Sequence, residues 1–542
     1  MSSSLIVETE EGTPHSFDVE TDAESGTLAD TLASHGFPLN TRCGERGLCR
    51  GCEVQLREGA VRFPNGEECA APATVRACQV RATGPLTVRV PARSRIDHRP
   101  WVSETFRIEI PCAHQPLFPT GARDTAFAID VGTTTVAVLL VDLASGEVLS
   151  RAGAFNEQIR FGDNVVTRID AVRTRPGALE GMQAAIVRDT ISPLLTRACQ
   201  RAGRGADRIA GGTIAGNTTM LHLLAGVDPS SLGVAPFTPR FIEGRQFAAR
   251  DLGLAVDGAL SPDIPVQLLP GISAYVGADI VAGVYATGMA YDTFPSLLVD
   301  IGTNGEVVLQ NSGKLYACAT AAGPAFEGSG LCCGTRAREG AVSGIRLAGE
   351  PFDVEVEMIG AIPPARAAGI CGSAYIDFLS HGRSSGLLLE SGRFDADAWA
   401  RVPATNRIEE NGERALRIAG DQRISEVDVA LLLQAKAAIG AGIEILLECA
   451  GLDSSDVLRV YLAGGFGMQL DVGHAIGIGL LPGFHEENVR VVGNTALAGA
   501  LLAILDKTTL GEMETLRSQV EVLELNLQES FEDRYIDHLM LP

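Results

Sequence analysis

The stretch AIDVGTTTVAVLLVD at residues 128–142 decides the fold, because a near-copy, LVDIGTNGEVVLQ, follows at residues 298–310. Each copy is an apolar strand that ends in aspartate, then x-Gly-Thr, then a polar turn and a second apolar strand. Strands that are apolar on both faces are typical of buried sheets flanked by helices. Two copies of one plan predict a duplicated α/β lobe.

Both hairpins have the residue types that bind a nucleotide's phosphates. Turn amides and hydroxyls hydrogen-bond phosphate oxygens, and a carboxylate at the end of the strand can hold Mg²⁺ through water. We therefore predict catalytic roles for Asp130 and Asp300, and Asp300 can also orient a water for attack on the γ-phosphate. The predicted phosphate contacts are Gly132, Thr133, Thr134 and Thr135 in the first hairpin, and Gly302, Thr303, Asn304 and Gly305 in the second. One such turn alone would be an ordinary hairpin.

A third loop completes a nucleotide site. VYLAGGFGMQLD at residues 460–471 runs from an apolar strand into Gly464, Gly465, Phe466 and Gly467, where backbone without side chains can lie flat against adenine or ribose. A plain strand-to-helix turn is the alternative. In this order the three segments resemble the ASKHA superfamily of actin, sugar kinases and Hsp70. That resemblance implies an α/β body of two duplicated RNase-H-like lobes that close on ATP.

The N-terminal part contains a cysteine cluster. CGERGLCRGC places Cys43, Cys49 and Cys52 in one glycine-rich loop, and Cys78 follows before a strand-like run. Four thiolates of which three lie close together in sequence are typical of a plant-type [2Fe–2S] cluster. Zinc is disfavoured because structural zinc sites usually show two paired short spacings. Reduced structural thiols are the other alternative, and Cys69 competes with Cys78 for the fourth position.

The cysteine loop and ACQVRATGPLTVRVP (residues 77–91) together resemble the N-terminal domain of the reductive activators of corrinoid proteins. Further blocks in the same order carry this resemblance to about residue 504, among them FNEQIRFGDNVVTRID, AGNTTMLHLLAG and VVGNTALAGALLA. The resemblance implies that one electron passes from the cluster to Co(II), regenerating Co(I) for a methyltransferase with the use of ATP and Mg²⁺. It also implies a corrinoid protein as partner, a reductase or ferredoxin as electron donor, and a homodimer.

The predicted domain order follows from these motifs. Residues 1–92 are expected to form an α+β β-grasp ferredoxin domain and residues 93–122 a linker. Residues 123–294 are expected to be the first lobe, with 123–207 as a dimerising segment, and residues 295–542 the second lobe with a C-terminal tail.

Composition excludes some partners. The formal net charge of −23 argues against nucleic acid or an anionic membrane as the main partner. We read neither a signal peptide nor a membrane span in the sequence. Twelve cysteines without an export signal are expected to be reduced thiols or metal ligands, which favours the cytoplasm.

Other functions remain open from the residues alone. A small-molecule kinase with a regulatory cluster, an activator of a non-corrinoid acceptor such as a dehydratase, and a simple electron carrier are the rivals. Two smaller features are expected to be structural. We predict that Cys332 and Cys333 are small buried thiols rather than a redox pair, and that His222 is a core histidine with its hydrogen bonds satisfied.

Overall fold

The computed structural model describes the chain except for residues 1, 9–13, 21–25, 38, 40–51, 91–113, 163, 303, 329, 336–338, 349–351, 411 and 465–469. The predicted linker therefore lies largely outside the described residues. The chain divides into two compact units, one of residues 1–98, 326–431 and 469–474 and the other of residues 99–325, 432–468 and 475–542.

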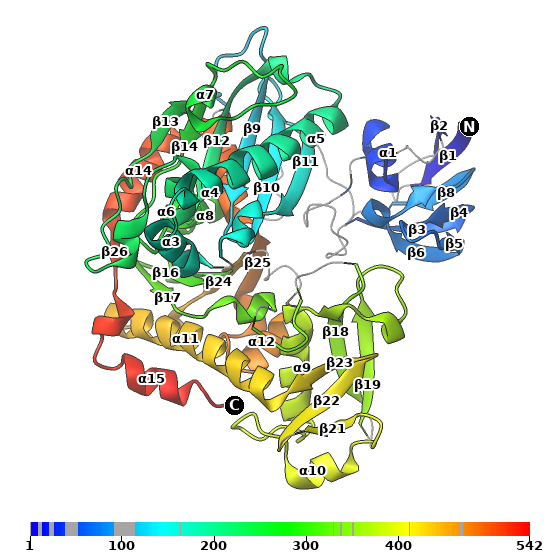
Figure 1. Ribbon diagram of the computed structural model, residues 1–542, viewed down its shortest axis with the longest axis vertical. Coiled ribbons are helices and arrows are strands. Elements are labelled where there is room, and N and C mark those ends of the chain that lie inside the picture. The colour runs from blue at the N-terminus through cyan, green and yellow to red at the C-terminus, as the bar shows by residue number, and fades with distance from the viewer. Residues whose placement is uncertain are drawn as a thin grey trace. The chain divides into compact units, whose positions relative to one another are not determined.

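The N-terminal part is a five-stranded mixed sheet in the order β2-β1-β8-β3-β6, with β1 and β8 parallel (Figure 1). Its helix α1 (Leu28–Ser34) begins at a capping box of Thr27 and Asp30, and buries Leu28 and Leu32 in a core shared with Leu5. The strands of this sheet are β1 (Ser2–Glu8), β2 (His15–Glu20), β3 (Glu53–Glu58), β6 (Ala73–Arg76) and β8 (Leu86–Arg89). A smaller sheet holds β4 (Ala60–Arg62), β5 (Glu68–Ala70) and β7 (Arg81–Ala82). The predicted α+β fold of this part is confirmed.

The second unit contains two six-stranded sheets, and five strands of each follow the same plan. In sequence order these five strands lie 3-2-1-4-5 in both sheets, as β11-β10-β9-β12-β14 and as β17-β16-β15-β24-β25. In both, the first three strands form an antiparallel meander, and the fourth and fifth are parallel to the first. The internal near-copy thus corresponds to a repeated sheet.

The strands of the first sheet are β9 (Thr125–Val131), β10 (Thr135–Asp142), β11 (Val148–Phe155), β12 (Ile209–Gly216), β13 (Arg245–Ala248) and β14 (Pro265–Leu268). Those of the second are β15 (Ser296–Ile301), β16 (Gly305–Asn311), β17 (Lys314–Thr320), β24 (Arg459–Ala463), β25 (Val489–Gly493) and β26 (Val520–Val522). The central strands are buried: all eight residues of β12 are, and in β9 every residue except Asp130. Asp130 therefore lies at the carboxyl end of a buried central strand.

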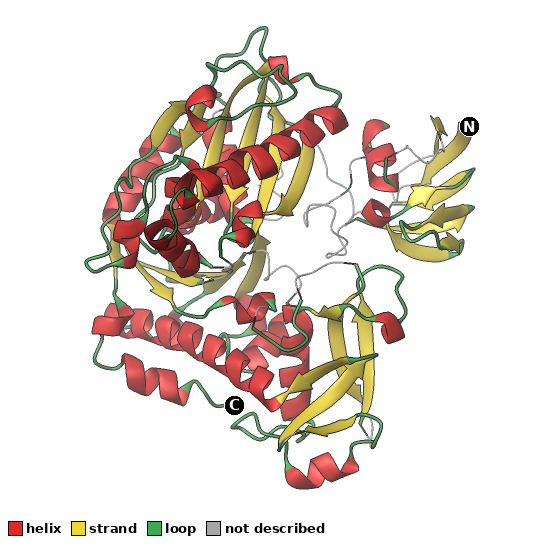
Figure 2. Ribbon diagram, viewed as in Figure 1, coloured by secondary structure: helices red, strands yellow, loops and turns green. Residues whose placement is uncertain are grey.

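Helices pack on the first sheet (Figure 2). Helix α5 contacts β10 and β11, and α13 contacts β9 and β12. The helices of this unit that the structure describes at full length are α3 (Val165–Thr174), α4 (Ala178–Ile186), α5 (Ser192–Ala202), α6 (Thr218–Leu224), α7 (Ala249–Leu252), α8 (Ala278–Thr287), α13 (Thr495–Leu505), α14 (Thr509–Gln519) and α15 (Phe531–Asp537).

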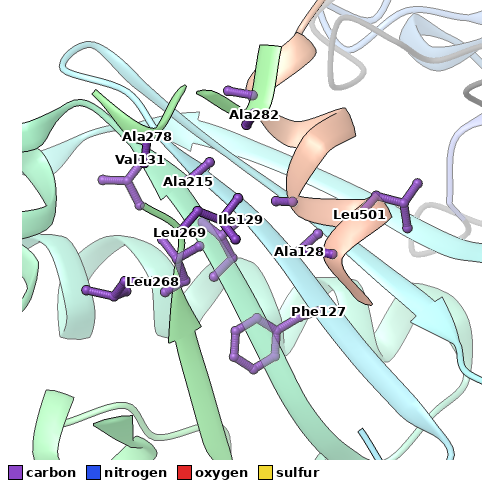
Figure 3. Packing of buried hydrophobic residues seen from close by; sticks show 14 of the residues in the cluster. Phe127, Ala128, Ile129, Val131, Ala215, Leu268, Leu269, Ala278, Ala282 and Leu501 are labelled. Atoms are coloured by element: carbon purple, nitrogen blue, oxygen red, sulfur yellow. The ribbon is translucent and has the colours of Figure 1, made fainter. Parts of the chain in front are cut away.

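Helices α8 and α13 pack closely in the core. A Cβ at Gly499 would lie 2.5 Å from the Ala282 carbonyl oxygen, so glycine is required at this contact. The Thr213 hydroxyl donates to the Ala500 carbonyl oxygen at 2.7 Å, which ties α13 to β12. Figure 3 shows Leu501 of α13 and Ala282 of α8 in the same cluster as Phe127 and Ile129 of β9. This packing fixes the strand end that carries Asp130.

Residues 326–431 hold two three-stranded sheets. Their elements are β18 (Ala341–Ala348), β19 (Asp353–Met358), β20 (Gly369–Ile370), α9 (Gly372–Ser384), α10 (Ala396–Arg401), β21 (Arg407–Glu410), β22 (Glu413–Ala419) and β23 (Gln422–Ser425). Helix α12 (Val472–Gly477) follows β24.

Helix α11 (Glu426–Ala450) is the one described helix that is long and apolar enough to cross a bilayer. Its most apolar 18-residue window is 78% buried inside the protein, which is the pattern of a core helix. The C-terminal tail docks on it: the Lys436 ammonium donates to the Met540 carbonyl oxygen at 2.8 Å, and His538 lies 3.1 Å from Glu444. The tail is therefore part of the packed body, and its strand β26 extends the second sheet beside β17.

Candidate functional site

The first Asp-Gly-Thr turn is held by three side chains from different segments. Asn156 Nδ2 donates to the Gly132 oxygen at 2.9 Å, Arg168 Nη2 to the Thr133 oxygen at 2.7 Å, and Asn217 Nδ2 to Thr133 Oγ1 at 3.0 Å. The three come from the end of β11, from α3 and from the N-cap of α6. The turn is preorganised because its carbonyl groups are directed into the protein.

The glycine amides close both turns. The Gly132 amide donates to the Thr135 oxygen at 3.0 Å, and the Gly302 amide donates to the Asn304 oxygen at 2.9 Å. A Cβ at Gly132 would lie 2.7 Å from the Thr135 oxygen, so only glycine fits. These two amides are thus used within the hairpins, and the predicted phosphate contacts fall to the residues that follow each glycine. Thr303 lies outside the described residues.

The two predicted aspartates face a common acidic cluster. Asp130 is the penultimate residue of β9 and accepts a hydrogen bond from Asn494 Nδ2 at 2.7 Å. Burial raises the pKa of Asp130 to about 6, against the Asn494 hydrogen bond that lowers it. Burial, and then the charge of Asp130, raise the pKa of Asp300 to about 7. The structure therefore brings Asp130 and Asp300 close enough to repel each other.

Two further carboxylates join this cluster. Burial, then Asp300 and Asp130, raise the pKa of Asp279, in the first turn of α8, to about 8. Burial, then Asp279 and Asp300, raise the pKa of Glu306 on β16 well above its usual value. Excess negative charge in a buried site is what a divalent cation neutralises. Among the described residues, however, no three His, Cys, Asp or Glu side chains converge to hold a metal directly.

The predicted adenosine loop begins beside Asp300. Gly464 has φ +92°, and a Cβ there would lie 2.4 Å from the Ile301 oxygen and 2.7 Å from Asp300 Oδ1. Its amide donates to the Gly493 oxygen at 3.0 Å. The strand end of β24 is thereby held against the second hairpin. Gly465, Phe466 and Gly467 lie outside the described residues.

Sequence reasoning missed several residues that hold this site. Asn156 and Arg168 lie in FNEQIRFGDNVVTRID, and Asn494 in VVGNTALAGALLA, blocks that carried only the family resemblance. Glu306 lies in the second hairpin, LVDIGTNGEVVLQ, and Asp279 in another block of the family resemblance, but neither was singled out as a site residue. The signal that could have indicated these site residues was the presence of polar side chains within buried, glycine-rich segments. Arg168 is fully buried, and a charged side chain in a core needs such partners.

In the N-terminal domain, two of the predicted cluster ligands meet. Cys52 Sγ and Cys78 Sγ lie 3.3 Å apart, and both residues are buried. This separation is too long for a disulfide, about 2.05 Å, and short enough for two thiolates to share one metal atom. Gln79 Nε2 also donates to Cys78 Sγ at 3.5 Å. The two described thiols fit an iron–sulfur centre; Cys43 and Cys49 lie outside the described residues.

Two minor expectations had opposite outcomes. His222 is confirmed as a core histidine: Nδ1 lies 2.7 Å from the Thr218 oxygen, Nε2 accepts from the Arg240 amide at 3.0 Å, and the ring stacks on Phe241. The prediction that Cys332 and Cys333 are buried is wrong. Cys332 is exposed and Cys333 half-buried, because they lie in a turn and not in a strand or helix.

Three family models match in succession along the chain. The model for a 2Fe-2S iron–sulfur cluster binding domain matches residues 8–83, the RACo middle region matches residues 125–292, and the C-terminal ASKHA domain of RACo matches residues 295–542. The chain belongs to the RACo family. The domain matches support a [2Fe–2S] cluster in its N-terminal part and ATP binding by the RACo body.

Individual relatives cover nearly the whole chain. The corrinoid activation enzyme RamQ of Eubacterium limosum is 29% identical, with 96% of each chain covered. A reductase of the Co(II) methylated amine-specific corrinoid protein from Methanosarcina barkeri is 25% identical over 76% of each chain. Among solved structures, a reductive activator for corrinoid, iron–sulfur protein is 29% identical, with a TM-score of 0.73 over 99% of this chain and 98% of its own. The predicted combination of ferredoxin and ASKHA domains is confirmed.

Proposed function

We propose that this RACo-family protein reduces the Co(II) form of a corrinoid protein to Co(I), with one electron from its [2Fe–2S] cluster and with the use of ATP. The combination of two features in one chain carries the proposal: a buried thiol pair suited to a cluster, and a duplicated body suited to a nucleotide. Relatives named as corrinoid activators support the choice of acceptor. The corrinoid protein would serve a methyltransferase.

Coupling to ATP has a thermodynamic reason. A plant-type cluster supplies one electron at roughly −400 mV. Reduction of Co(II) to Co(I) is harder, and each 59 mV of shortfall costs about tenfold in a one-electron equilibrium. A nucleotide-dependent change in affinity for the Co(II) partner can compensate for the shortfall, because a ligand shifts an equilibrium by its differential affinity for the two states.

The proposed roles within the body follow from the geometry of the two hairpins. Asp130 and Asp300 would hold Mg²⁺ through water, and Asn494 would keep the Asp130 carboxylate oriented. The predicted phosphate contacts are the polar residues after Gly132 and Gly302. The glycine loop that begins at Gly464 would receive the adenosine. Closure of the two lobes on ATP would exclude water from these groups.

The remaining partners are part of the same proposal. A reductase or a ferredoxin would supply the electron, and the protein would act in the cytoplasm as a homodimer formed through residues 123–207. A size measurement on the full chain, with and without Mg-ATP, tests the dimer.

The test of the proposed function uses a matched pair of cysteine variants. Chemically reduced protein, mixed without oxygen with a Co(II) corrinoid protein and Mg-ATP, should yield the absorption of Co(I). Cys78→Ala should yield none, whereas Cys69→Ala should behave as the unaltered protein. Co(I) formation by a Cys78→Ala protein that contains no iron or sulfide would exclude the cluster as the electron source.

A further inference from the structure

The adjacent cysteines Cys332 and Cys333 lie in a described turn that the proposed function does not use. Cys332 is exposed and Cys333 half-buried, so both can be reached by a small reagent. Each is held by specific contacts. The Cys332 amide donates to Asp428 Oδ1 at 2.7 Å, and its thiol donates to Asp428 Oδ2 at 2.8 Å. The Arg423 amide donates to Cys333 Sγ at 3.4 Å.

Asp428 is fixed from its other side. It is only 2% exposed, and its Oδ2 also accepts from the Ser425 amide at 2.9 Å and the Ser425 hydroxyl at 3.0 Å. The Asp428 amide donates back to Ser425 Oγ at 3.2 Å. These reciprocal bonds form a capping box at the start of α11. The carboxylate that accepts the Cys332 hydrogen bond is therefore rigidly placed.

The two thiols differ in acidity. The neighbouring Cys332 thiol, and after it the Arg423 amide, lower the pKa of Cys333 to about 6. The hydrogen bond with Cys333, burial and the charge of Asp428 raise the pKa of Cys332 well above its ordinary value. Cys333 is thus the more acidic thiol, and Cys332, which donates its proton in a hydrogen bond to Asp428, is its protonated partner. A nucleophilic thiolate beside a second thiol is typical of a redox pair.

We propose that Cys332 and Cys333 form a reversible thiol–disulfide redox site that small disulfides oxidise. The Cys333 thiolate attacks a disulfide RSSR, forming Cys333–S–SR and releasing RS⁻. Cys332 then passes its proton to Asp428 and attacks the Cys333 sulfur, forming the Cys332–Cys333 disulfide and releasing a second RS⁻. Two protein thiols are oxidised, and RSSR is reduced to two thiols.

Adjacent cysteines make this disulfide easy to reduce. The Cα atoms of consecutive residues are about 3.8 Å apart, closer than the usual 4.4–6.8 Å of disulfides. Strained disulfides have higher potentials and are the labile, regulatory kind. Oxidation also removes the S–H donor from Asp428, so the state of the pair changes the hydrogen bonding at the start of α11.

The test treats the full-length protein with oxidised glutathione under anaerobic conditions and follows its peptides by mass spectrometry. The expected product is a loss of two hydrogen masses in the peptide with both cysteines, reversed by a dithiol. Cys332→Ser should stop at a glutathione adduct on Cys333. Asp428→Asn, which removes the proton acceptor, should slow ring closure several-fold without slowing formation of the first adduct.

The pH dependence separates this site from an ordinary exposed thiol. The rate of Cys333 alkylation by iodoacetamide should rise with pH and reach half its maximum near pH 6, because the thiolate is the reactive form. Cys449 serves as the control. It is an exposed residue, but partial burial of its thiol raises its pKa, so it should react only at alkaline pH. Equal profiles for Cys333 and Cys449, or adducts on both cysteines of the pair without ring closure, would overturn the proposal.

Discussion

Arg168 Nη2 donates to the Thr133 carbonyl oxygen at 2.7 Å, across 35 positions of sequence, from a side chain that is fully buried. The same guanidinium donates through Nε to the Gly162 oxygen at 2.9 Å and through Nη1 to Gln158 Oε1 at 3.0 Å. One cation thereby joins helix α3 and the segment at residues 158–162 to the first phosphate turn. Lysine cannot replace it, because a single ammonium does not reach three acceptors in a planar fork.

We therefore expect Arg168→Met to weaken ATP binding by about tenfold, which is about 1.4 kcal/mol. Loss of the donor to the Thr133 oxygen also costs about 1–3 kcal/mol of stability. Nucleotide titration and thermal unfolding measure the two effects. Arg173→Ala, an exposed arginine on the same helix α3, is the matched control and should change neither. Unaltered ATP affinity in a folded Arg168→Met protein would contradict the claim that Arg168 holds the first phosphate turn in place for ATP.

The cysteine geometry predicts which thiol is the fourth cluster ligand. Cys78→Ala should lose the visible absorption of the [2Fe–2S] centre and most of its iron and sulfide, because Cys78 Sγ lies 3.3 Å from Cys52 Sγ. Cys69→Ala should keep both, since Cys69 lies on β5 in the separate small sheet. Iron and sulfide analysis of the two variants measures this. The reverse pattern would assign the fourth position to Cys69.

We expect Gln79 to affect the reduction potential of the [2Fe–2S] centre through its hydrogen bond to Cys78. Its Nε2 donates to Cys78 Sγ at 3.5 Å, and hydrogen bonds to cluster sulfurs stabilise the reduced, more negative state. Gln79→Leu should therefore lower the reduction potential, by an amount on the order of tens of millivolts, without loss of iron. An anaerobic redox titration followed by absorption measures the shift. A potential that is unchanged or raised would show that this hydrogen bond does not reach the cluster.

The acidic cluster predicts a pH dependence of stability. The pKa values of Asp130, Asp300 and Asp279 are raised to about 6, 7 and 8, from an ordinary value of 3.8. A carboxyl group whose pKa is raised by folding stabilises the folded state in its protonated form. This contribution to the free energy of unfolding is complete below about pH 4 and is lost as pH rises through 6 to 8. Without nucleotide and metal, the unfolding temperature of the body should fall by a few degrees between pH 6 and pH 8.5.

Two comparisons make this prediction specific. Mg-ATP should raise the unfolding temperature more at pH 8.5 than at pH 6, because the cation neutralises the ionised carboxylates. Asp279→Asn should flatten the pH dependence without nucleotide, whereas Asp251→Asn, on the exposed side of α7, should leave it unchanged. An unfolding temperature that rises over this range would contradict the cluster's effect.

The parts of this protein that repeat a pattern could be predicted from sequence, and the parts that depend on long-range packing could not. The apolar strands that carry Asp130 and Asp300 near their ends predicted the duplicated sheets, because burial on both faces of a strand leaves a nearly continuous apolar run that is easy to recognise. Asn494 and Asp279 reach the same site only through the packing of α13 and α8. The sequence around them carried the family resemblance but did not indicate that these two side chains lie at the nucleotide site.

The exposed pair Cys332 and Cys333 illustrates the same limit. Small thiols are usually buried, so composition favoured a core position. The turn that contains them is set by a hydrogen bond to Asp428, almost a hundred residues further along the chain. A contact of this kind has no local sequence signal.

The central claim is that ATP drives electron transfer to cobalt. The most direct test mixes the reduced protein, without oxygen, with a Co(II) corrinoid protein and follows the Co(I) absorption with Mg-ATP, with Mg-ADP and without nucleotide. We predict Co(I) with Mg-ATP only, and a strongly reduced yield for Asp300→Asn with Mg-ATP. Equal amounts of Co(I) with and without ATP would contradict the account and leave the ASKHA body without a role in the reduction.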